Sequence, residues 1–119
     1  MHDGDFYASV RQEGALATLD LRGEINRNAD TQMTTAYDEA STSGVATLIL
    51  NFTDVDYINS TGIAVIVAVL GRARKDGRTV IAYGLTDHYK HLFDITRLSD
   101  FMDIYDDEST ALAGVGAGA

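Results

Sequence analysis

Residues 48–67 read LILNFTDVDYINSTGIAVIV, two apolar runs that are joined by a polar segment. The first run completes ATLILNF, residues 46–52, which is short, apolar and followed by polar residues. This pattern is typical of a strand that is buried on both faces of a sheet. The polar segment therefore connects a buried strand to the element that the second apolar run forms.

The second apolar run, within residues 61–76, fits either a strand or a helix. Its β-branched residues favour a strand. A helix is favoured because Ser60 and Thr61 can cap its start, the sequence RARKD supplies a cationic last turn, and Gly77 can stop it. The run is also long for a strand. We therefore predict a buried helix over residues 61–76.

The remaining segments alternate between strand and helix patterns. Residues 5–11 and 15–22 are short and alternating, and the turn between them predicts a β-hairpin, which Gly23 ends. The later patterns predict a helix over 29–43, a strand over 79–84, a helix over 87–95, a strand over 101–105 and a helix over 107–113. The order ββαβαβαβα predicts an α/β fold, in which a mixed sheet of four or five strands carries about four helices.

Two of the predicted helices have recognisable caps and apolar faces. Asn28 or Asp30 can cap the helix over 29–43, and Thr86 can cap the helix over 87–95. The apolar stripe of the first helix comprises Met33, Ala36, Tyr37 and Ala40. One side of the second helix carries Tyr89, Leu92 and Phe93. Both faces are expected to pack on the sheet.

Length and composition limit the classes of function. The chain has 119 residues, enough for one domain, which we place at residues 1–113, followed by a flexible glycine-rich tail at 114–119. The absence of cysteine excludes a disulfide framework, a cysteine-ligated zinc site and thiol catalysis, and it suits a cytoplasmic protein. The formal net charge of -9 repels nucleic acid and anionic membranes. We expect neither as a partner, and we expect no signal peptide or membrane span.

The polar junction that ends in Ser60, Thr61 and Gly62 is the candidate functional site. A serine there stands at the start of the predicted helix, where unpaired N–H groups and the helix dipole favour negative charge. A phosphoryl group on Ser60 adds about -1.5 to -2 charge beside Asp54 and Asp56, and it repels a partner that docks through neutral polar contacts. Gly62 lets another backbone approach closely. The alternative is that Ser60 is only the helix cap.

Other side-chain groupings do not indicate an enzyme or a metal site. His88 and His91 lie three residues apart in one predicted helix, near Asp87 and Asp94, but no third metal ligand is suggested. Ser60 lacks the G-x-S-x-G surroundings of a hydrolase, and no phosphate-binding glycine motif occurs. We expect a protein without catalytic residues, metal or cofactor.

Three stretches together resemble the STAS-domain family, and specifically the anti-sigma-factor antagonists of bacteria. Residues 48–67 are similar to the family's signature, and RGEIN at 22–26 is similar to a strand end that usually reads G-E-[LI]-D. KHLFDITRLSDFMDIYDDESTAL at 90–112 is similar to the family's third helix, last strand and closing helix. The resemblance covers residues 5–112 and favours the helical interpretation of 61–76.

The resemblance implies a small protein switch. In that family an unphosphorylated antagonist binds an anti-sigma factor, which is an ATP-dependent serine kinase, and thereby frees the sigma factor. The kinase phosphorylates the serine before the [ST]-G pair, here Ser60, and a PP2C-type phosphatase reverses the reaction. The partner-binding loop that the resemblance implies comprises Asn26, Asp54, Asp56, Asn59, Ser60, Thr61 and Gly62. We expect a monomer or a weak dimer.

Two positions depart from the family pattern, which usually has aspartate immediately before the acceptor serine and after G-E-[LI]. Here these residues are Asn59 and Asn26, which keep the hydrogen bonding but lose the charge. Both lie in loops that should converge near the acceptor. The changes either retune the choice of kinase or mark a constitutive scaffold module, which binds a transporter, a sensor or another partner without being phosphorylated.

Overall fold

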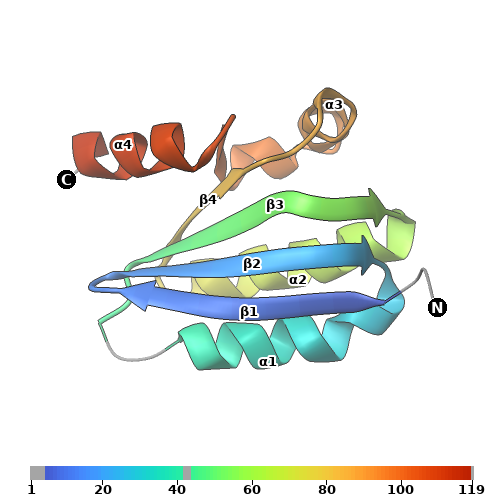
Figure 1. Cartoon of the computed structure of the whole chain (residues 1–119), viewed down its shortest axis with the longest axis horizontal. Helices are drawn as coiled ribbons and strands as arrows, with labels where there is room; N and C mark the ends of the chain where they lie inside the picture. Colours follow the sequence, from blue (N-terminus) through green and yellow to red (C-terminus); the bar gives the residue numbers. More distant parts are fainter. Residues whose placement is uncertain (1–4, 42–43, 119) are drawn as a thin grey trace.

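The computed structural model describes residues 5–41 and 44–118, and it has the predicted element order (Figure 1). Within these residues the strands are β1 (Phe6–Glu13), β2 (Leu16–Ile25), β3 (Thr47–Ile58), β4 (Thr79–Tyr83) and β5 (Asp103–Tyr105). The α-helices are α1 (Asp30–Ala40), α2 (Ser60–Lys75), α3 (Asp87–Ile95) and α4 (Glu108–Gly118). Two short 3-10 helices are η1 (Arg27–Ala29) and η2 (Leu98–Asp100). The predicted α/β class is confirmed.

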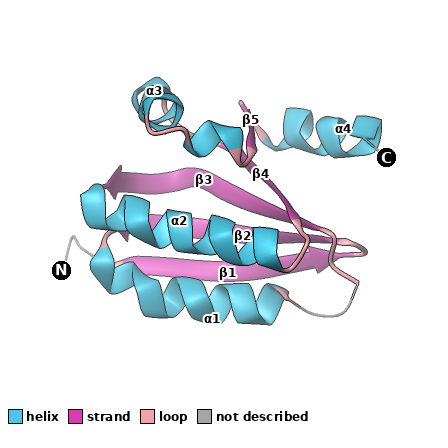
Figure 2. Ribbon diagram, turned by 180° about the vertical axis from the view of Figure 1, so that it is seen from behind, coloured by secondary structure: helices cyan, strands magenta, loops and turns pink. Residues whose placement is uncertain are grey.

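A single mixed sheet runs through the described part of the chain, with the strand order β1-β2-β3-β4-β5. The first two strands form the predicted antiparallel hairpin, and the other neighbouring strands are parallel. Helices α1 and α2 cover one face of the sheet (Figure 2). At one end of the molecule β2 and β3 finish and α2 begins, so this end carries the candidate site.

The main core lies between the sheet and helices α1, α2 and α3. Leu48 and Leu50 of β3 belong to this core, whereas Ile49 belongs to a smaller cluster under α4 with Ile81 and Tyr83. β3 is thus buried on both faces, as its apolar run predicts. Each buried leucine or isoleucine side chain contributes about 1.5–3 kcal/mol to the stability of the fold. β3 therefore stabilises the packing of helices on both faces of the sheet.

The predicted helix faces are confirmed. Helix α2 buries residues at helical spacing against the sheet, namely Val65, Ile66, Val69, Leu70 and Ala73. Packing of this apolar face outweighs the β propensity of the segment. The predicted stripe of α1 is likewise buried. In α3, Thr86 is the cap, and Phe93 packs edge-on against Phe52, with ring centroids 5.8 Å apart.

Three strands end later than predicted: β1 by two residues, β2 by three and β3 by six. β3 continues to Ile58, because the polar residues that follow Phe52 pair with Arg22–Ile25 of β2 through two register shifts. The prediction that Gly23 ends β2 is wrong. This glycine has φ 95°, and a Cβ there would lie 2.0 Å from the carbonyl oxygen of Asp5. The glycine therefore permits an irregular strand that comes close to the chain before β1.

The start of α1 also differs from the prediction. Neither Asn28 nor Asp30 caps the helix; Asn26 instead caps η1, the turn that leads into α1. The side chain of Asn26 accepts a hydrogen bond from the Asn28 N–H at 2.8 Å. Helix α1 ends at Ala40, and residues 42–43 of the predicted helix lie outside the described residues.

The C-terminal elements shift slightly from their predicted bounds. Phe101 and Met102 follow η2, so β5 begins at Asp103 and has three residues. Helix α4 continues to Gly118, past its predicted end, so the backbone of residues 114–118 is helical, and the flexibility of the tail stays a prediction. Among the helices of the described chain, none combines the length and the apolar character that a membrane crossing requires.

Candidate functional site

Asn59 is the cap of α2, and its side chain organises the start of the helix. Its Oδ1 accepts hydrogen bonds from the Gly62 N–H at 2.9 Å and from the Thr61 hydroxyl at 2.7 Å. The prediction that Ser60 or Thr61 caps this helix is wrong. A cap side chain reaches the N–H groups two or three residues later, and Asn59 already occupies that position.

Ser60 is the first residue of α2, and its side chain is exposed. Within the described residues its hydroxyl has no hydrogen-bond partner. The unpaired N–H groups of the first turn and the helix dipole give its surroundings a partial positive charge. Another molecule can therefore reach this hydroxyl without first breaking an internal contact.

Thr61 joins the start of α2 to the segment that follows β2. Its hydroxyl oxygen accepts a hydrogen bond from the backbone N–H of Arg27 at 2.9 Å. The N–H of Asn59 donates to the Ile25 carbonyl at 3.2 Å. Because Asn26 lies between Ile25 and Arg27, the two loops that contain asparagine in place of the family aspartate converge, as predicted.

Gly62 makes the close contact between α2 and β2 possible. A Cβ at this position would lie 1.9 Å from the carbonyl oxygen of Ile25, so a larger residue does not fit there. The close backbone approach predicted for Gly62 is therefore an approach within the chain. On the other side of the junction, the hydroxyl of Tyr89 in α3 accepts a hydrogen bond from the Ile58 N–H at 3.0 Å.

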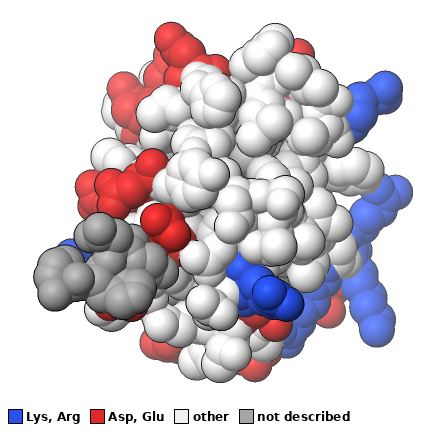
Figure 3. Space-filling model, turned by 90° about the vertical axis from the view of Figure 1, so that its right-hand side faces the viewer, with Lys and Arg blue, Asp and Glu red and all other residues white. Residues whose placement is uncertain are grey.

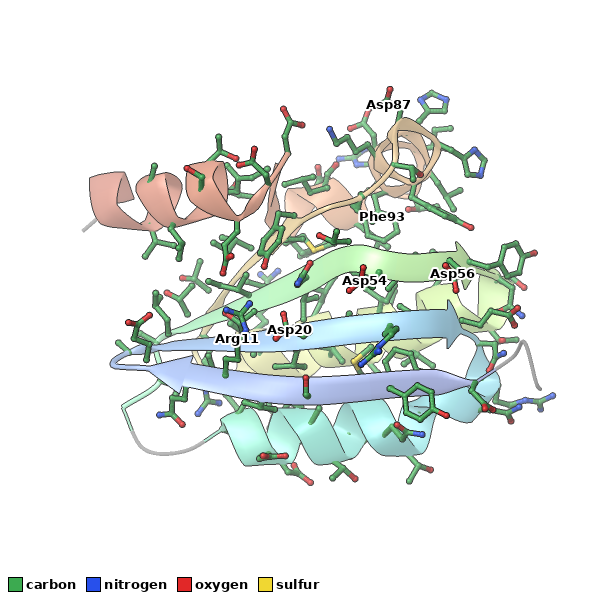
Figure 4. The ribbon with its side chains drawn as sticks, in the orientation of Figure 1. Arg11, Asp20, Asp54, Asp56, Asp87 and Phe93 are labelled. Atoms are coloured by element: carbon green, nitrogen blue, oxygen red, sulfur yellow. The ribbon has the colours of Figure 1, made fainter. Side chains whose placement is uncertain are left out.

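Asp54 and Asp56 lie on β3 and not in the loop at its end. Both are exposed (Figure 4), and Asp54 stands opposite Arg22 in the register with β2. Four residues separate Asp54 from Ile58, roughly 13 Å along a strand. Asp56 lies two residues before Ile58. The strand therefore brings Asp56 near the junction and keeps Asp54 at a distance from it.

Three further residues were not singled out from the sequence. Tyr57 and Val67 are large apolar side chains that are 49% and 48% exposed. Exposed side chains of this kind serve as anchors at protein interfaces. The only sequence signal for Tyr57 is an aromatic residue within a polar segment. The third residue, Arg27, is recognisable only once the fold places it beside Thr61.

An open hollow of about 520 Å³ lies beside the start of α2, between it and η1. Its lining includes Arg27, Asn28, Thr31, Thr61 and Ala64. Figure 3 views this end of the molecule and shows a broad uncharged surface, with acidic groups to one side and basic groups to the other. The end of the molecule at which α2 begins therefore offers a largely uncharged surface for docking.

A second polar cluster lies on the face of the sheet opposite α1 and α2 and includes Arg11 and Asp20 (Figure 4). Arg11 donates two hydrogen bonds to Asp20, at 2.6 and 2.9 Å, and one to Glu108 of α4 at 3.1 Å. Asn51 donates to Asp20 at 2.7 Å. Burial acts to raise the pKa of Asp20, but the hydrogen bonds from Arg11 and Asn51 hold it below its ordinary value. These groups partner one another and tie α4 to the hairpin.

The histidines noted in the sequence lie on α3. His88 and His91 are exposed residues of α3. Across residues 5–41 and 44–118, no three potential metal ligands gather in one place. The expectation of a protein without metal or cofactor stays a prediction.

Comparison with known proteins gives a match over nearly the whole chain. Residues 7–111 match the family model described as STAS domain. The chain is also 30% identical over 84 residues to an anti-sigma-B factor antagonist of Listeria monocytogenes, which covers 71% of this chain and 74% of that protein. The sequence alone therefore relates the chain to STAS domains and, at 30% identity, to an anti-sigma-B factor antagonist.

Solved structures share the fold. SpoIIAA, an anti-sigma factor antagonist in its unphosphorylated form, gives a TM-score of 0.71 at 15% identity and covers 94% of this chain and 99% of its own. The phosphorylated form of SpoIIAA from Bacillus gives 0.64 at 17% identity, covering 91% and 98%. A sulfate transporter family protein from Wolinella succinogenes gives 0.77 at 14% identity, covering 90% and 89%. On the match of residues 7–111, with this shared fold, the chain belongs to the STAS domain family.

Proposed function

We propose that this protein is an anti-sigma factor antagonist that works as a phosphorylation switch. The unmodified protein binds an anti-sigma factor, itself an ATP-dependent serine kinase, and so releases the sigma factor. Phosphorylation of Ser60 ends the binding, and a PP2C-type phosphatase restores it. Support comes from the family membership and from the 30% identity to the Listeria antagonist. The proposal places the protein in the cytoplasm, where bacterial transcription takes place.

The observation that carries the proposal is the exposed hydroxyl of Ser60 at the first residue of α2. Its neighbours are occupied: the Asn59 side chain caps the helix, and the Thr61 hydroxyl donates to Asn59 and accepts from Arg27. A kinase that approaches the start of α2 therefore meets a Ser60 hydroxyl that is not engaged, whereas the Thr61 hydroxyl is engaged twice. This favours Ser60 over Thr61 as the acceptor.

The surface around Ser60 suits docking by shape and neutral contacts. It is largely uncharged in a protein whose net charge is -9. Tyr57, three residues before the serine, offers exposed apolar contact area, and Val67 offers more of it further along α2. An interface with a neutral centre and such anchors is strongly affected by a charge placed in its middle.

The modification itself requires no catalytic group from this chain. The kinase transfers the γ-phosphoryl group of ATP to Ser60 Oγ, an O–P bond forms, ADP leaves, and the hydroxyl proton is released. The product carries about -1.5 to -2 additional charge at neutral pH. A docked partner must then bury this charge or dissociate, and the nearby carboxylate of Asp56 adds repulsion of the same sign.

The two asparagines sharpen this charge change. Asn59 and Asn26 both act as caps through a side-chain oxygen, which an amide supplies as well as a carboxylate. The Asn26 amide also donates a hydrogen bond to the Glu24 carboxylate at 3.3 Å. The asparagines therefore keep the geometry of the junction and add no charge to that of Glu24 and Asp56. Phosphorylation then places about -1.5 to -2 charge beside two side chains that carry none.

A phosphorylation assay tests the acceptor. Wild type, Ser60→Ala and Ser9→Ala are incubated with ATP and each candidate anti-sigma kinase of the same genome, and intact mass is measured. Ser9 is an exposed serine of β1 and serves as the matched control. We expect one added phosphate in wild type and Ser9→Ala, its removal by a PP2C-type phosphatase, and none added to Ser60→Ala.

A binding assay with the same kinase tests the switch. Ser60→Ala should bind like the wild type, and Ser60→Asp should bind at least about ten-fold more weakly, because burying an unpaired charge costs more than 1.4 kcal/mol. If no kinase modifies the protein while it still forms a stable complex with a partner, the chain is a constitutive STAS scaffold and the proposed switch is wrong.

A further inference from the structure

The hollow between η1 and the start of α2 is a feature that phosphorylation of Ser60 does not by itself require. It is bounded by Arg27 and Asn28 on one side and by Thr61 and Ala64 on the other. Ser60 precedes Ala64 by four residues, so their side chains lie on the same face of α2. Ser60 does not itself line the hollow, but it directly precedes Thr61, which does, and a group that extends from its hydroxyl can reach the hollow.

Arg27 brings an uncommitted positive charge to this hollow. Its backbone is held to Thr61 by the 2.9 Å hydrogen bond, and its side chain is exposed. Among the described residues no carboxylate forms an ion pair with Arg27, although Asp30 lines the same hollow. By contrast, an aspartate pairs with each of Arg11, Arg72, Arg78 and Arg97.

We propose that the phosphoryl group carried by Ser60 turns into this hollow and is held by the guanidinium of Arg27. The proposal rests on the proposed function for the arrival of the phosphate. Arginine presents a planar fork that makes two parallel, charge-assisted hydrogen bonds to phosphate oxygens. The volume of about 520 Å³ leaves ample room for a phosphoryl group and the arginine side chain together.

With this pairing, phosphorylation of Ser60 changes two properties of the docking surface. The phosphoryl group adds negative charge, and Arg27 is withdrawn from the surface that the unmodified protein offers. A partner that places an acidic group against Arg27 loses this contact when Ser60 is phosphorylated. We expect the partner surface that fits the unmodified protein to be largely uncharged and to place one carboxylate against Arg27.

The test uses the full chain with phosphoserine incorporated at position 60 during translation. Phosphorus NMR follows the second ionisation of the phosphate, whose ordinary pKa is about 6. A cation beside the phosphate favours its doubly charged form, so the wild-type phosphoserine should titrate at least about half a pH unit below that of Arg27→Gln. Arg22→Gln is the matched control, because Arg22 lies near the same end but lines a different hollow, beside Asp54.

We expect Arg22→Gln to titrate like the wild type. Equal pKa values for the phosphoserine in wild type and Arg27→Gln overturn the pairing, and so does an equal shift in Arg22→Gln. If Arg27→Gln fails to fold, the Nε–H resonance of Arg27 in the wild-type protein decides: phosphoserine must shift it, and an unchanged resonance overturns the pairing.

The titration result does not depend on whether the proposed function is correct. The phosphoserine is installed without a kinase, so the titration can be measured whether or not any kinase modifies the protein. If no kinase modifies the protein, the proposed switch is wrong. If the phosphoserine has equal pKa values in wild type and Arg27→Gln, only the proposed role of Arg27 is wrong.

Discussion

The hydroxyl oxygen of Thr61 lies 2.9 Å from the backbone nitrogen of Arg27 and accepts its hydrogen bond. The same hydroxyl donates to the Asn59 side chain at 2.7 Å. One small side chain thus ties the segment after β2 to the cap of α2. The rigidity of the junction around Ser60 depends on this pair of bonds, and it can be tested without knowledge of the partner.

Thr61→Ala should loosen the junction. The change removes two hydrogen bonds, each with a net contribution of about 1 kcal/mol. We expect the Arg27 amide to exchange with deuterium about five- to thirty-fold faster, the factor that 1–2 kcal/mol represents. Thr61→Ser keeps the hydroxyl and should restore the slow exchange. Unchanged exchange of Arg27 in Thr61→Ala would show that the bond does not constrain the loop.

Gly62→Ala should destabilise the fold strongly. The added Cβ would lie 1.9 Å from the Ile25 carbonyl oxygen, so α2 must shift away from β2. We expect the free energy of unfolding, measured in urea, to fall by about 2–4 kcal/mol. Gly71→Ala is the control in the same helix, because a Cβ there meets no atom within 4 Å. It should stabilise by about 0.5–1 kcal/mol, and similar effects at both positions would contradict the close contact.

Asn59→Asp should keep the cap and add charge to it. Both groups that bond to Asn59 are donors, the Gly62 N–H and the Thr61 hydroxyl, so a carboxylate accepts from them equally well. A negative charge at a helix start contributes about 0.3–1 kcal/mol. We expect this gain in unfolding free energy at pH 7 and its loss at pH 2, where the carboxyl is protonated.

The same variant tests whether Asn59 tunes the kinase reaction. Asn59→Asp restores the family pattern before the acceptor, and under the proposed function it should be phosphorylated at Ser60 faster than the wild type. Initial rates by intact mass provide the measurement. An equal or slower rate would separate the role of Asn59 as a cap from any role in kinase choice.

Asp20→Asn should make stability less dependent on pH. The pKa of Asp20 is lowered in the folded protein, so its carboxylate stabilises the fold above its unfolded value of about 3.9, and the contribution disappears as the pH falls through the folded value. We expect a loss of about 1–2 kcal/mol at pH 7 that shrinks toward zero near pH 2. Asp54→Asn, at an exposed carboxylate, should change stability by less than about 0.5 kcal/mol. A loss in Asp20→Asn that is the same at every pH would contradict the ionic contribution.

The order of elements was predictable because apolar periodicity dominates it. The helical assignment of 61–76 held because its buried residues repeat at helical spacing, from Val65 to Ala73. The length of β3 was not predictable from its polar residues after Phe52. There β4 has already ended, opposite Asn51, so this part of β3 pairs only with β2 and tolerates exposed side chains.

The acceptor junction was located from sequence, but its internal bonds were not. Asn59, Ser60 and Thr61 are all good capping residues, and local sequence does not select among them. A contact with a residue distant in sequence decides which of them is the cap. The Ile25 carbonyl accepts a hydrogen bond from the Asn59 N–H and packs against Gly62. The importance of Arg27 has the same origin, because it lies far from Thr61 in the chain and meets it only through the fold.

The start of β1 and the end of α4 lie at opposite ends of the molecule. The Asp5 carbonyl accepts a hydrogen bond from the Glu24 N–H at 3.1 Å, so the polypeptide enters the fold at the same end as Ser60. Helix α4 runs out at the opposite end (Figure 1). A fluorescent protein, an affinity tag or a sensor-chip linkage attached after α4 therefore leaves the serine open to a visiting partner, whereas the same attachment ahead of β1 obstructs it.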